Sequence, residues 1–207
     1  MHQQEKLETG TTTVGIVCKD AVVVAAESKS TMGYLVSSKN AQKVYQVDDK
    51  IAVTTAGGAG DTQAVIRMLK AEINLYKTTR NTEFTVKAAG TLLANLLNAN
   101  RYYPYIAMLI IAGHDKEGFH LYTIDPVGGL EEDKYAATGS GSPMAYGVLE
   151  NEYREGMARD EGVRLLVRSI RSARERDIFS GGRINVIVID KNGLEVVPEE
   201  KIREFAK

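Results

Sequence analysis

The order of the apolar segments constrains the fold of this chain more than any other feature of its sequence. Short runs rich in Val, Ile, Thr and Ala come first, two segments with helical spacing follow, and the same succession then repeats before a last group of strands. The expected strands span residues 12–18, 21–26, 43–47, 51–55, 106–113, 118–124, 134–138, 183–189 and 194–197. The expected helices span residues 60–81, 85–103, 142–156 and 160–176, and a short charged helix ends the chain.

This order differs from the strict strand–helix alternation of a parallel, doubly wound sheet. Two antiparallel sheets packed face to face, each covered on its outer side by a pair of helices, would bury every apolar face. The sequence therefore predicts a mixed α/β (α+β) fold, namely a four-layer α/β/β/α sandwich.

Local signals support several element boundaries. The charged pair Lys19-Asp20 between two apolar runs predicts a hairpin turn. Asp61 occupies the position of an N-cap for the first helix. Pro104 stops the second helix, because proline cannot continue a helix and also disfavours the helical conformation in the residue before it.

Composition and charge narrow the class of protein. The chain has 207 residues, of which 43% are apolar and 26% charged, a balance typical of one globular domain. A formal net charge of -1 favours neither nucleic acid nor an anionic membrane as a partner. The single cysteine, Cys18, excludes an intramolecular disulfide framework and fits a reducing compartment. The longest strongly apolar run is too short to span a bilayer and the leader is polar, so we expect a cytoplasmic protein.

The segment "ETGTTTVGI" places three threonines directly after Gly10, where the first strand is expected to begin. Threonine is common in strands because its branched Cβ suits a pleated surface. The same residues could instead mark a site where the chain is cut to expose a threonine amine. The motif alone leaves both interpretations open.

The sequence lacks the motifs of the commoner kinds of catalytic or metal site. His2, His114 and His120 have no spacing with Cys18 that resembles a four-ligand zinc site, so we expect no metal. Cys18 lies within an apolar strand with no histidine near it in sequence, as a buried structural thiol does. The chain has no Gly-x-Ser-x-Gly segment, and its glycine-rich stretches "AGGAGD" and "GSGSP" lack the Lys-Ser/Thr of a phosphate loop.

The stretch "AGGAGD" (residues 56–61) connects an expected strand to an expected helix. Backbone amides at such a helix start point outward and could hold an oxyanion. A tight packing turn would explain the same glycines.

Charged residues within apolar segments offer a further signal. Glu27 ends the run "AVVVAAE" and Lys43 opens the run "KVYQV". Buried charges cost several kcal/mol unless they are paired, so the two become natural partners if their strands are neighbours. The alternative places both at strand ends in water. The arginines at 164, 168, 171 and 174 have helical spacing, and the near-neutral net charge favours a solvated or subunit-facing stripe over a nucleic-acid site.

Several separated segments, taken in order, resemble one family. The segments "GTTTVGI", "NAQKVYQVDDKIAVTTAGGAGD", "ATGSGSPMAYGVLE", "DEGV" and "RERDIFSGG" are similar to those of archaeal-type proteasome β subunits. The resemblance extends from Gly10 to the last expected strand. It implies an N-terminal-nucleophile hydrolase that acts as a threonine protease, and the family's four-layer sandwich agrees with the one predicted above. It also implies a propeptide, residues 1–10, that is removed by autolysis between Gly10 and Thr11, and a single catalytic domain, residues 11–207.

The resemblance implies catalytic roles for individual residues. Thr11 is the nucleophile, and its hydroxyl needs a base, which the α-amino group exposed by cleavage can supply with a reference pKa of about 7.7–8.0. Lys43 lies beside Thr11 and lowers the proton affinity of the hydroxyl. Glu27 pairs with Lys43, although many relatives carry aspartate there. The amide of Gly57 is the oxyanion donor.

The remaining implied site residues hold the amine and the substrate. Asp177, Ser140 and Ser180 match the group that orients the threonine amine. Thr13 is expected on the same strand face as Thr11, and Thr12 on the opposite face. The pocket for the substrate side chain is lined by Ser30, Thr55 and Ala59, with Tyr45 at its floor. Because these residues are small and uncharged, we expect an open pocket without fixed charge and cleavage after apolar or aromatic residues.

The resemblance also implies partners. In the expected assembly, β subunits form stacked seven-membered rings between outer rings of proteasome α subunits. A regulatory ATPase is expected to act through the α rings, and unfolded proteins are the expected substrates. We expect no cofactor, no nucleic acid and no membrane partner. Two alternatives stay open: a non-catalytic structural ring subunit, and an N-terminal-nucleophile amidohydrolase that acts on small molecules.

Overall fold

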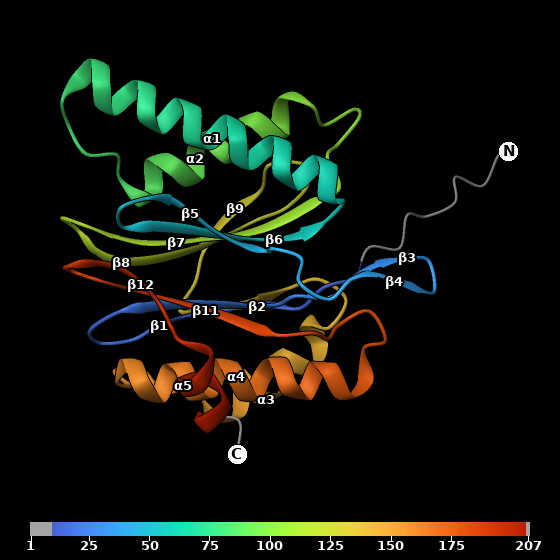
Figure 1. The fold of residues 1–207 in the computed structure, drawn as a ribbon. Helices are drawn as coiled ribbons and strands as arrows, with labels where there is room; N and C mark the ends of the chain where they lie inside the picture. The colour runs from blue at the N-terminus through green and yellow to red at the C-terminus, as the bar shows by residue number, and fades with distance from the viewer. Residues whose placement is uncertain (1–9, 206–207) are drawn as a thin grey trace, which may run out of the picture.

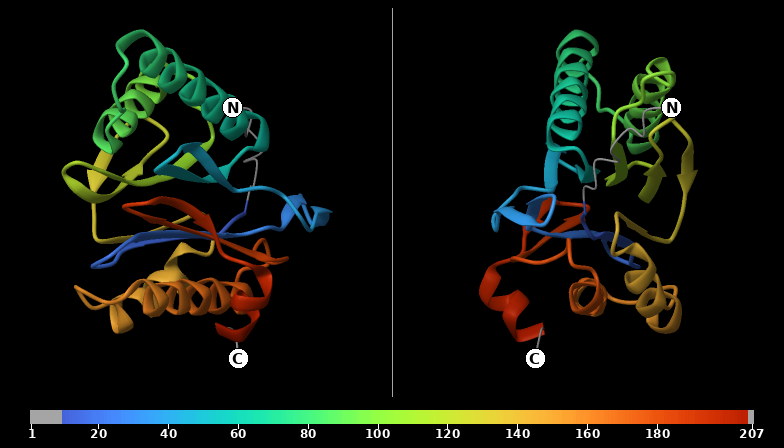
Figure 2. Two further views of the ribbon diagram at one scale, coloured as in Figure 1. Left: turned by 60° about the vertical axis from the view of Figure 1, so that its left-hand side comes forward. Right: turned by 90° about the vertical axis from the view of Figure 1, so that its right-hand side faces the viewer.

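Two five-stranded sheets face each other and are enclosed by helices, in a computed structural model that describes residues 10–205 (Figure 1). The first sheet has the strand order β10-β1-β2-β11-β12, and the second has the order β5-β6-β7-β8-β9. All pairings within both sheets are antiparallel. Figure 2 shows α1 and α2 on one outer side of the sheets and α3, α4 and α5 on the other. The predicted four-layer sandwich of two antiparallel sheets is therefore confirmed.

The elements have the following bounds. The first sheet contains β1 (Thr13–Val17), β2 (Val22–Glu27), β10 (Tyr135–Thr138), β11 (Ile184–Asp190) and β12 (Gly193–Val196). The second contains β5 (Val44–Asp48), β6 (Ile51–Gly57), β7 (Ala107–Asp115), β8 (Gly118–Ile124) and β9 (Leu130–Glu132). The helices are α1 (Ala59–Arg80), α2 (Val86–Ala99), α3 (Ser142–Glu152), α4 (Arg159–Arg176) and α5 (Glu199–Phe205), and a separate hairpin contains β3 (Ser30–Met32) and β4 (Leu35–Ser38).

The two packed faces of β2 explain why its sequence is a continuous apolar run. Val22, Val24 and Ala26 point into the core between the two sheets, while Val23 and Ala25 belong to the core beneath α3 and α4. All five side chains are fully buried, because a central strand of a four-layer fold has a packed layer on each face. Strict polar–apolar alternation is therefore absent from this strand.

The helix starts differ in part from their prediction. Gly58, and not Asp61, is the N-cap of α1, and Asp61 lies in the first turn. Its carboxylate accepts a hydrogen bond from the backbone N of Ile106 at 2.8 Å, so Asp61 joins the start of α1 to the segment before β7. At the start of α2, the side chain of Thr85 caps the helix by accepting a hydrogen bond from the N of Ala88 at 3.1 Å.

The sequence analysis missed β3, β4 and β9, and it extended α3 to residue 156 although this helix ends at Glu152. The missed strands contain three or four residues, too few to show a clear alternation. The β3–β4 hairpin projects beyond the edge of the two main sheets (Figure 2).

The sheet register brings several chain segments to one end of the molecule. Thr13 at the start of β1 pairs with Ala26 near the end of β2 and with Thr138 at the end of β10. The residues just before Thr13, just after Ala26 and just after Thr138 therefore meet at the same edge. Within residues 10–205, no helix is long and apolar enough to cross a membrane.

Candidate active site

Thr11 lies two residues before the start of β1 and is almost completely buried, with 3% of its surface exposed. Its Oγ1 donates a hydrogen bond to the carbonyl oxygen of Gly10 at 2.5 Å and accepts one from Nζ of Lys43 at 2.8 Å. The hydroxyl is therefore held between an ammonium group and the carbonyl of the peptide bond that precedes it. Gly10 is required here because a Cβ at this position would lie 1.6 Å from the Cβ of Phe179.

Lys43 and Glu27 form a buried ion pair, but not as neighbours in one sheet. Glu27 ends β2 in the first sheet, whereas Lys43 directly precedes β5 in the second. The packing of the two sheets brings them together, so the assumption of neighbouring strands was wrong although the pairing is present. Nζ of Lys43 also donates a hydrogen bond to the carbonyl oxygen of Lys29 at 2.5 Å.

The carboxylate of Glu27 is fully buried and accepts hydrogen bonds through both oxygens. Oε1 accepts from Lys43 and from the N of Thr12 at 3.4 Å. Oε2 accepts from the N of Lys29 at 2.6 Å and from the N of Gly181 at 2.9 Å. The glutamate carboxylate therefore reaches Lys43 through one oxygen and the backbone amides of Lys29 and Gly181 through the other.

Burial lowers the pKa of Lys43 below that of an exposed lysine, because water no longer solvates the ammonium. The carboxylate of Glu27 opposes this shift through its charge and its hydrogen bond. The lysine amine consequently holds its proton less tightly than a lysine at the surface.

A second group of polar residues lies around the backbone of Thr11, and Asp177 is its central hydrogen-bond acceptor. One carboxylate oxygen, Oδ2, accepts hydrogen bonds from the hydroxyls of Ser140 and Ser180, each at 2.6 Å. The N of Thr11 donates to Oγ of Ser140 at 3.1 Å. The hydroxyls of Thr12 and Ser180 lie 2.7 Å apart, and Thr12 is the donor because Ser180 gives its own proton to Asp177. The nitrogen of Thr11 is thus connected through Ser140 to a buried carboxylate.

Two glycines allow close backbone approaches at the site. Gly57, at the end of β6, has φ of 139°, and a Cβ there would lie 2.0 Å from the carbonyl oxygen of Ile106. Gly139, with φ of 89°, passes so close to Thr11 that a Cβ would lie 2.1 Å from the threonine carbonyl oxygen. Both positions favour glycine through backbone conformation as well as through space.

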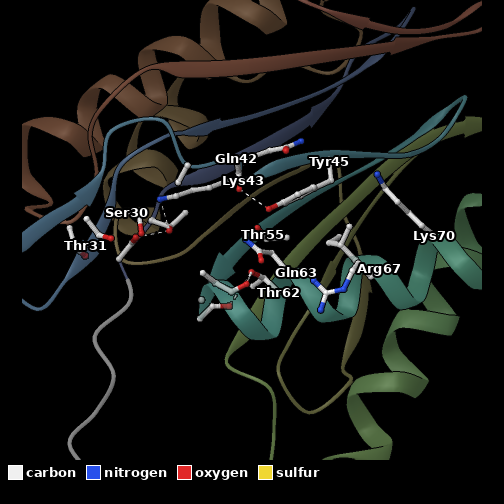
Figure 3. A pocket seen from close by; sticks show the side chains of 18 residues that line it. Ser30, Thr31, Gln42, Lys43, Tyr45, Thr55, Thr62, Gln63, Arg67 and Lys70 are labelled. Atoms are coloured by element: carbon white, nitrogen blue, oxygen red, sulfur yellow. Dashed lines mark hydrogen bonds between the residues drawn. The ribbon is translucent and has the colours of Figure 1, made fainter.

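A cavity of about 690 Å³ opens beside Thr11. Its lining residues are Gly10, Thr11, Ser30, Thr31, Ser37, Ala41, Gln42, Lys43, Tyr45, Thr55, Gly57, Gly58, Ala59, Thr62, Gln63, Ile66, Arg67 and Lys70. The predicted pocket residues Ser30, Tyr45, Thr55 and Ala59 all lie in this wall. Figure 3 shows Ser30 and Lys43 at one end of the cavity, and Arg67 and Lys70 of α1 toward the other.

The expectation of a pocket without fixed charge is wrong, because Arg67 and Lys70 contribute to the lining. The prediction considered only residues near the strand that precedes the Gly57 turn. The helical spacing of Gln63, Arg67 and Lys70 along residues 60–81 is the sequence signal that could have placed them on one side of α1.

Comparison with known proteins identifies the family. The family described as Proteasome subunit matches residues 7–189 of the chain. The chain belongs to the proteasome subunit family. A protein named Proteasome subunit beta from Methanosarcina mazei is 50% identical over 200 residues, which cover 96% of this chain and 95% of the relative. A protein of the same name from Ferroglobus placidus is 52% identical over 198 residues, covering 95% and 94%.

These matches confirm the resemblance seen in the sequence. Because the identity extends over nearly the whole length of proteins named as proteasome β subunits, the chain is a β-type subunit of a proteasome core, and hence a protease subunit.

Other residues of this proteasome β-type chain were missed or placed differently by the sequence analysis. Thr12, expected to face away from the chemistry, contributes its hydroxyl to the Asp177 group. Thr13 instead lies between the sheets, where its hydroxyl is 2.6 Å from that of Thr138 and accepts a hydrogen bond from Thr54 at 2.9 Å. Thr12 and Thr13, adjacent at the start of β1, therefore place their hydroxyls in two different layers of the fold.

Cys18 is buried, and burial followed by the charges of Asp20 and Glu161 raises the pKa of its thiol to about 12. Among the described residues, no group of three or more His, Cys, Asp or Glu side chains is arranged to hold a metal ion. On the arginine stripe of α4, Arg168 pairs with Glu152. The guanidinium carbon of Arg164 lies 4.9 Å from the ring centroid of Phe205.

Proposed function

We propose that Thr11 is the nucleophile of a threonine-type endopeptidase and that it first cuts its own chain. The observation that carries the proposal is the placement of its hydroxyl between the ammonium of Lys43 and the carbonyl of Gly10. Burying a lysine and a glutamate beside this hydroxyl costs free energy, and packing of a threonine against a strand would not require it.

The activation step is an acyl shift within the chain. Oγ1 of Thr11 attacks the carbonyl carbon of Gly10, and the peptide C–N bond breaks as the Thr11 nitrogen leaves and takes up a proton. The resulting ester joins Gly10 to the Thr11 oxygen. Water then hydrolyses this ester, which releases the leader with a carboxyl group on Gly10 and restores the Thr11 hydroxyl beside a free α-amine. Residues 1–9 lie outside the described part of the chain, and Gly10 marks the described end of this leader.

In the mature form, the freed amine of Thr11 acts as the base for its own hydroxyl. Its reference pKa of about 7.7–8.0 lies close to neutral pH, as general-base catalysis requires. Ser140, which accepts a hydrogen bond from this nitrogen, and Asp177 behind it hold the amine in place. Lys43 stabilises the threonine oxygen as it loses its proton. The amide of Gly57, in the wall of the same cavity, would stabilise the oxyanion of the substrate.

The same proposal extends to the assembly. Residues 11–207 form the catalytic domain, and unfolded protein chains are cut inside a chamber formed by β rings between α rings, which receive substrate from a regulatory ATPase in the cytoplasm. We assign α3 and α4 to the contact between the two β rings, because this helix pair carries the partly exposed Met144 and Tyr146 and the exposed Arg168, residue types that are enriched at subunit interfaces. Family membership supports assembly with other proteasome subunits.

Intact mass measurement of three assembled variants tests the function. Thr11→Ala should assemble, keep its leader and show no peptidase activity, whereas Thr11→Ser should retain part of the processing because it keeps a hydroxyl. Thr12→Ala should still be cut at the Gly10-Thr11 bond, because the Thr12 hydroxyl contacts Ser180 rather than Gly10. Loss of the leader from Thr11→Ala particles that contain no wild-type chain and no added protease would disprove self-cleavage.

A further inference from the structure

Phe179 lies against Gly10, the residue before the bond that Thr11 is proposed to cut. A Cβ added to Gly10 would lie 1.6 Å from Cβ of Phe179, 2.3 Å from its Cγ and 2.9 Å from its Cδ2. Apart from Gly10 and its two chain neighbours, these are the three nearest heavy atoms, and all of them belong to one side chain. Phe179 therefore covers the face of Gly10 from which a side chain would project.

The contact restrains a group that Thr11 already holds from another side. Oγ1 of Thr11 donates a hydrogen bond to the carbonyl oxygen of Gly10 at 2.5 Å. Gly10 is buried, with the hydroxyl at its carbonyl oxygen and Phe179 beside its Cα. The carbonyl carbon is bonded to both of these atoms, so it has little freedom to move away from Oγ1.

The segment that carries Phe179 is anchored on both sides of this residue. The N of Phe179 donates a hydrogen bond to Oδ1 of Asp177 at 3.2 Å. Two residues further along, the N of Gly181 donates to Oε2 of Glu27 at 2.9 Å. Both carboxylates belong to the polar groups that surround Thr11, so the phenylalanine has a fixed position relative to the threonine.

Core packing and substrate binding do not account for this side chain. Phe179 is partly exposed, and it belongs to none of the three apolar cores formed within residues 10–205. It is also absent from the described lining of the cavity beside Thr11. The contact with Gly10 is therefore the feature that gives this apolar side chain a role.

We propose that Phe179 is a positioning residue for self-cleavage, because its side chain holds Gly10 so that the carbonyl carbon faces Oγ1 of Thr11. The inference rests on the proposed function and concerns its acyl shift. A displacement of about 1 Å between reacting groups can slow a reaction about a hundredfold. Gly10 departs with the leader, so this contact exists only before cleavage. Phe179 should consequently matter much more for leader loss than for peptide turnover by the mature chain.

The first test follows leader loss by intact mass after the full chain is assembled with proteasome α subunits. Phe179→Gly should slow leader loss about a hundredfold, Phe179→Ala about tenfold because it keeps Cβ, and Phe179→Leu less than about threefold because it also keeps atoms near Cγ and Cδ2. Ile178→Gly is the matched control, because it introduces glycine into the same segment but removes a side chain that is 66% exposed. It should lose its leader at the wild-type rate.

A double variant then asks whether Phe179 acts through Gly10. Gly10→Ala and Phe179→Gly disturb the same contact, so their effects should not multiply. We expect Gly10→Ala/Phe179→Gly to lose its leader no more slowly than Gly10→Ala alone, whereas independent effects of about a hundredfold each would give about ten-thousandfold. Effects that multiply would overturn the assignment of the contact.

The remaining outcomes separate this inference from the proposed function. Wild-type leader loss in Phe179→Gly, or equally slow loss in Ile178→Gly, would overturn the inference alone. An equal decrease in peptide turnover per mature chain, counted with a covalent threonine-directed inhibitor, would also overturn it. If Phe179→Gly fails to assemble, Phe179→Ala and Phe179→Leu give the same comparison. Leader loss from Thr11→Ala particles that contain no wild-type chain would instead refute the proposed function.

Discussion

Replacing Glu27 by glutamine tests the electrostatic reasoning at the site most directly. The substitution leaves Lys43 buried without a counter-charge, and the new NH₂ group must face donors, because Glu27 accepts from Lys43 and from the amides of Lys29 and Gly181. Breaking a buried ion pair by removing one partner costs about 3–5 kcal/mol. For a domain of this size, each kcal/mol lowers the Tm by about 2–4 °C, so the expected decrease is about 6–20 °C.

The measurement is thermal unfolding of the chain in a Thr11→Ala background, so that all samples keep the same leader. The control is Glu195→Gln, which removes a half-exposed partner of Arg159 at 3.1 Å and should cost at most about 1 kcal/mol. The double variant Glu27→Gln/Lys43→Met removes both buried charges and should regain much of the lost stability. A Tm for Glu27→Gln no lower than that of the control would refute the reasoning.

The same variant has a pH signature whose sign follows from Lys43. Burial already lowers the pKa of this lysine, and without Glu27 only the charge of Asp177 opposes that shift. A lysine whose pKa is lower in the folded state loses its proton there first, so the unfolded state binds more protons and stability rises with pH until the unfolded pKa is reached. The stability deficit of Glu27→Gln should therefore shrink between pH 7 and pH 10, and a deficit that grows over this range would contradict the argument.

Further predictions concern single residues. Lys43→Arg should keep the fold but fail to restore peptidase activity, because a planar guanidinium cannot replace a compact ammonium beside Thr11; near-normal turnover would show that charge alone matters. Gly10→Ala should slow leader loss about a hundredfold by mass spectrometry, because the new Cβ would collide with Phe179 and displace the scissile carbonyl; normal processing would contradict this. Cys18 should resist thiol-alkylating reagents at pH 8 in the folded chain and react after unfolding, since its pKa of about 12 keeps the thiol protonated; rapid labelling of folded protein would contradict this. Charge reversals at Arg164, Arg168 and Arg171 should yield half-assemblies on sizing columns, and full-size particles would exclude α4 from the ring contact.

The layer order could be predicted from the sequence. Each helix or strand buries at least one face, so its own residues carry an apolar pattern that reveals its type and its place in the order of elements. The fully buried run of β2 is an example, since only a strand packed on both faces can be apolar throughout. The site residues were identified through family resemblance, and their distances could not be foreseen. Glu27 and Lys43 meet across two sheets, a contact set by sheet packing that no local pattern encodes.

The unexpected features share one physical origin. Arg67 and Lys70 line the cavity because α1 crosses the second sheet beside β5 and β6, and the direction of that crossing is a property of the packed layers. Thr12 joins the Asp177 group because the segment after α4 folds back against the start of β1. In each case the contacting residues are distant in sequence. A sequence motif can therefore identify the residue but cannot predict which residues surround it.

The division of the site between two sheets has a consequence for activation. Thr11, Glu27 and Asp177 belong to the first sheet and the helix that covers it, whereas Lys43 and Gly57 belong to the second sheet. The hydroxyl of Thr11 gains its ammonium neighbour only when the two sheets are packed together. The proposed nucleophile would therefore stay weak in a partly folded chain and become competent once the intersheet core has formed. Self-cleavage at Gly10 would then require a completed fold, which keeps a free threonine protease from arising in chains that have not yet packed.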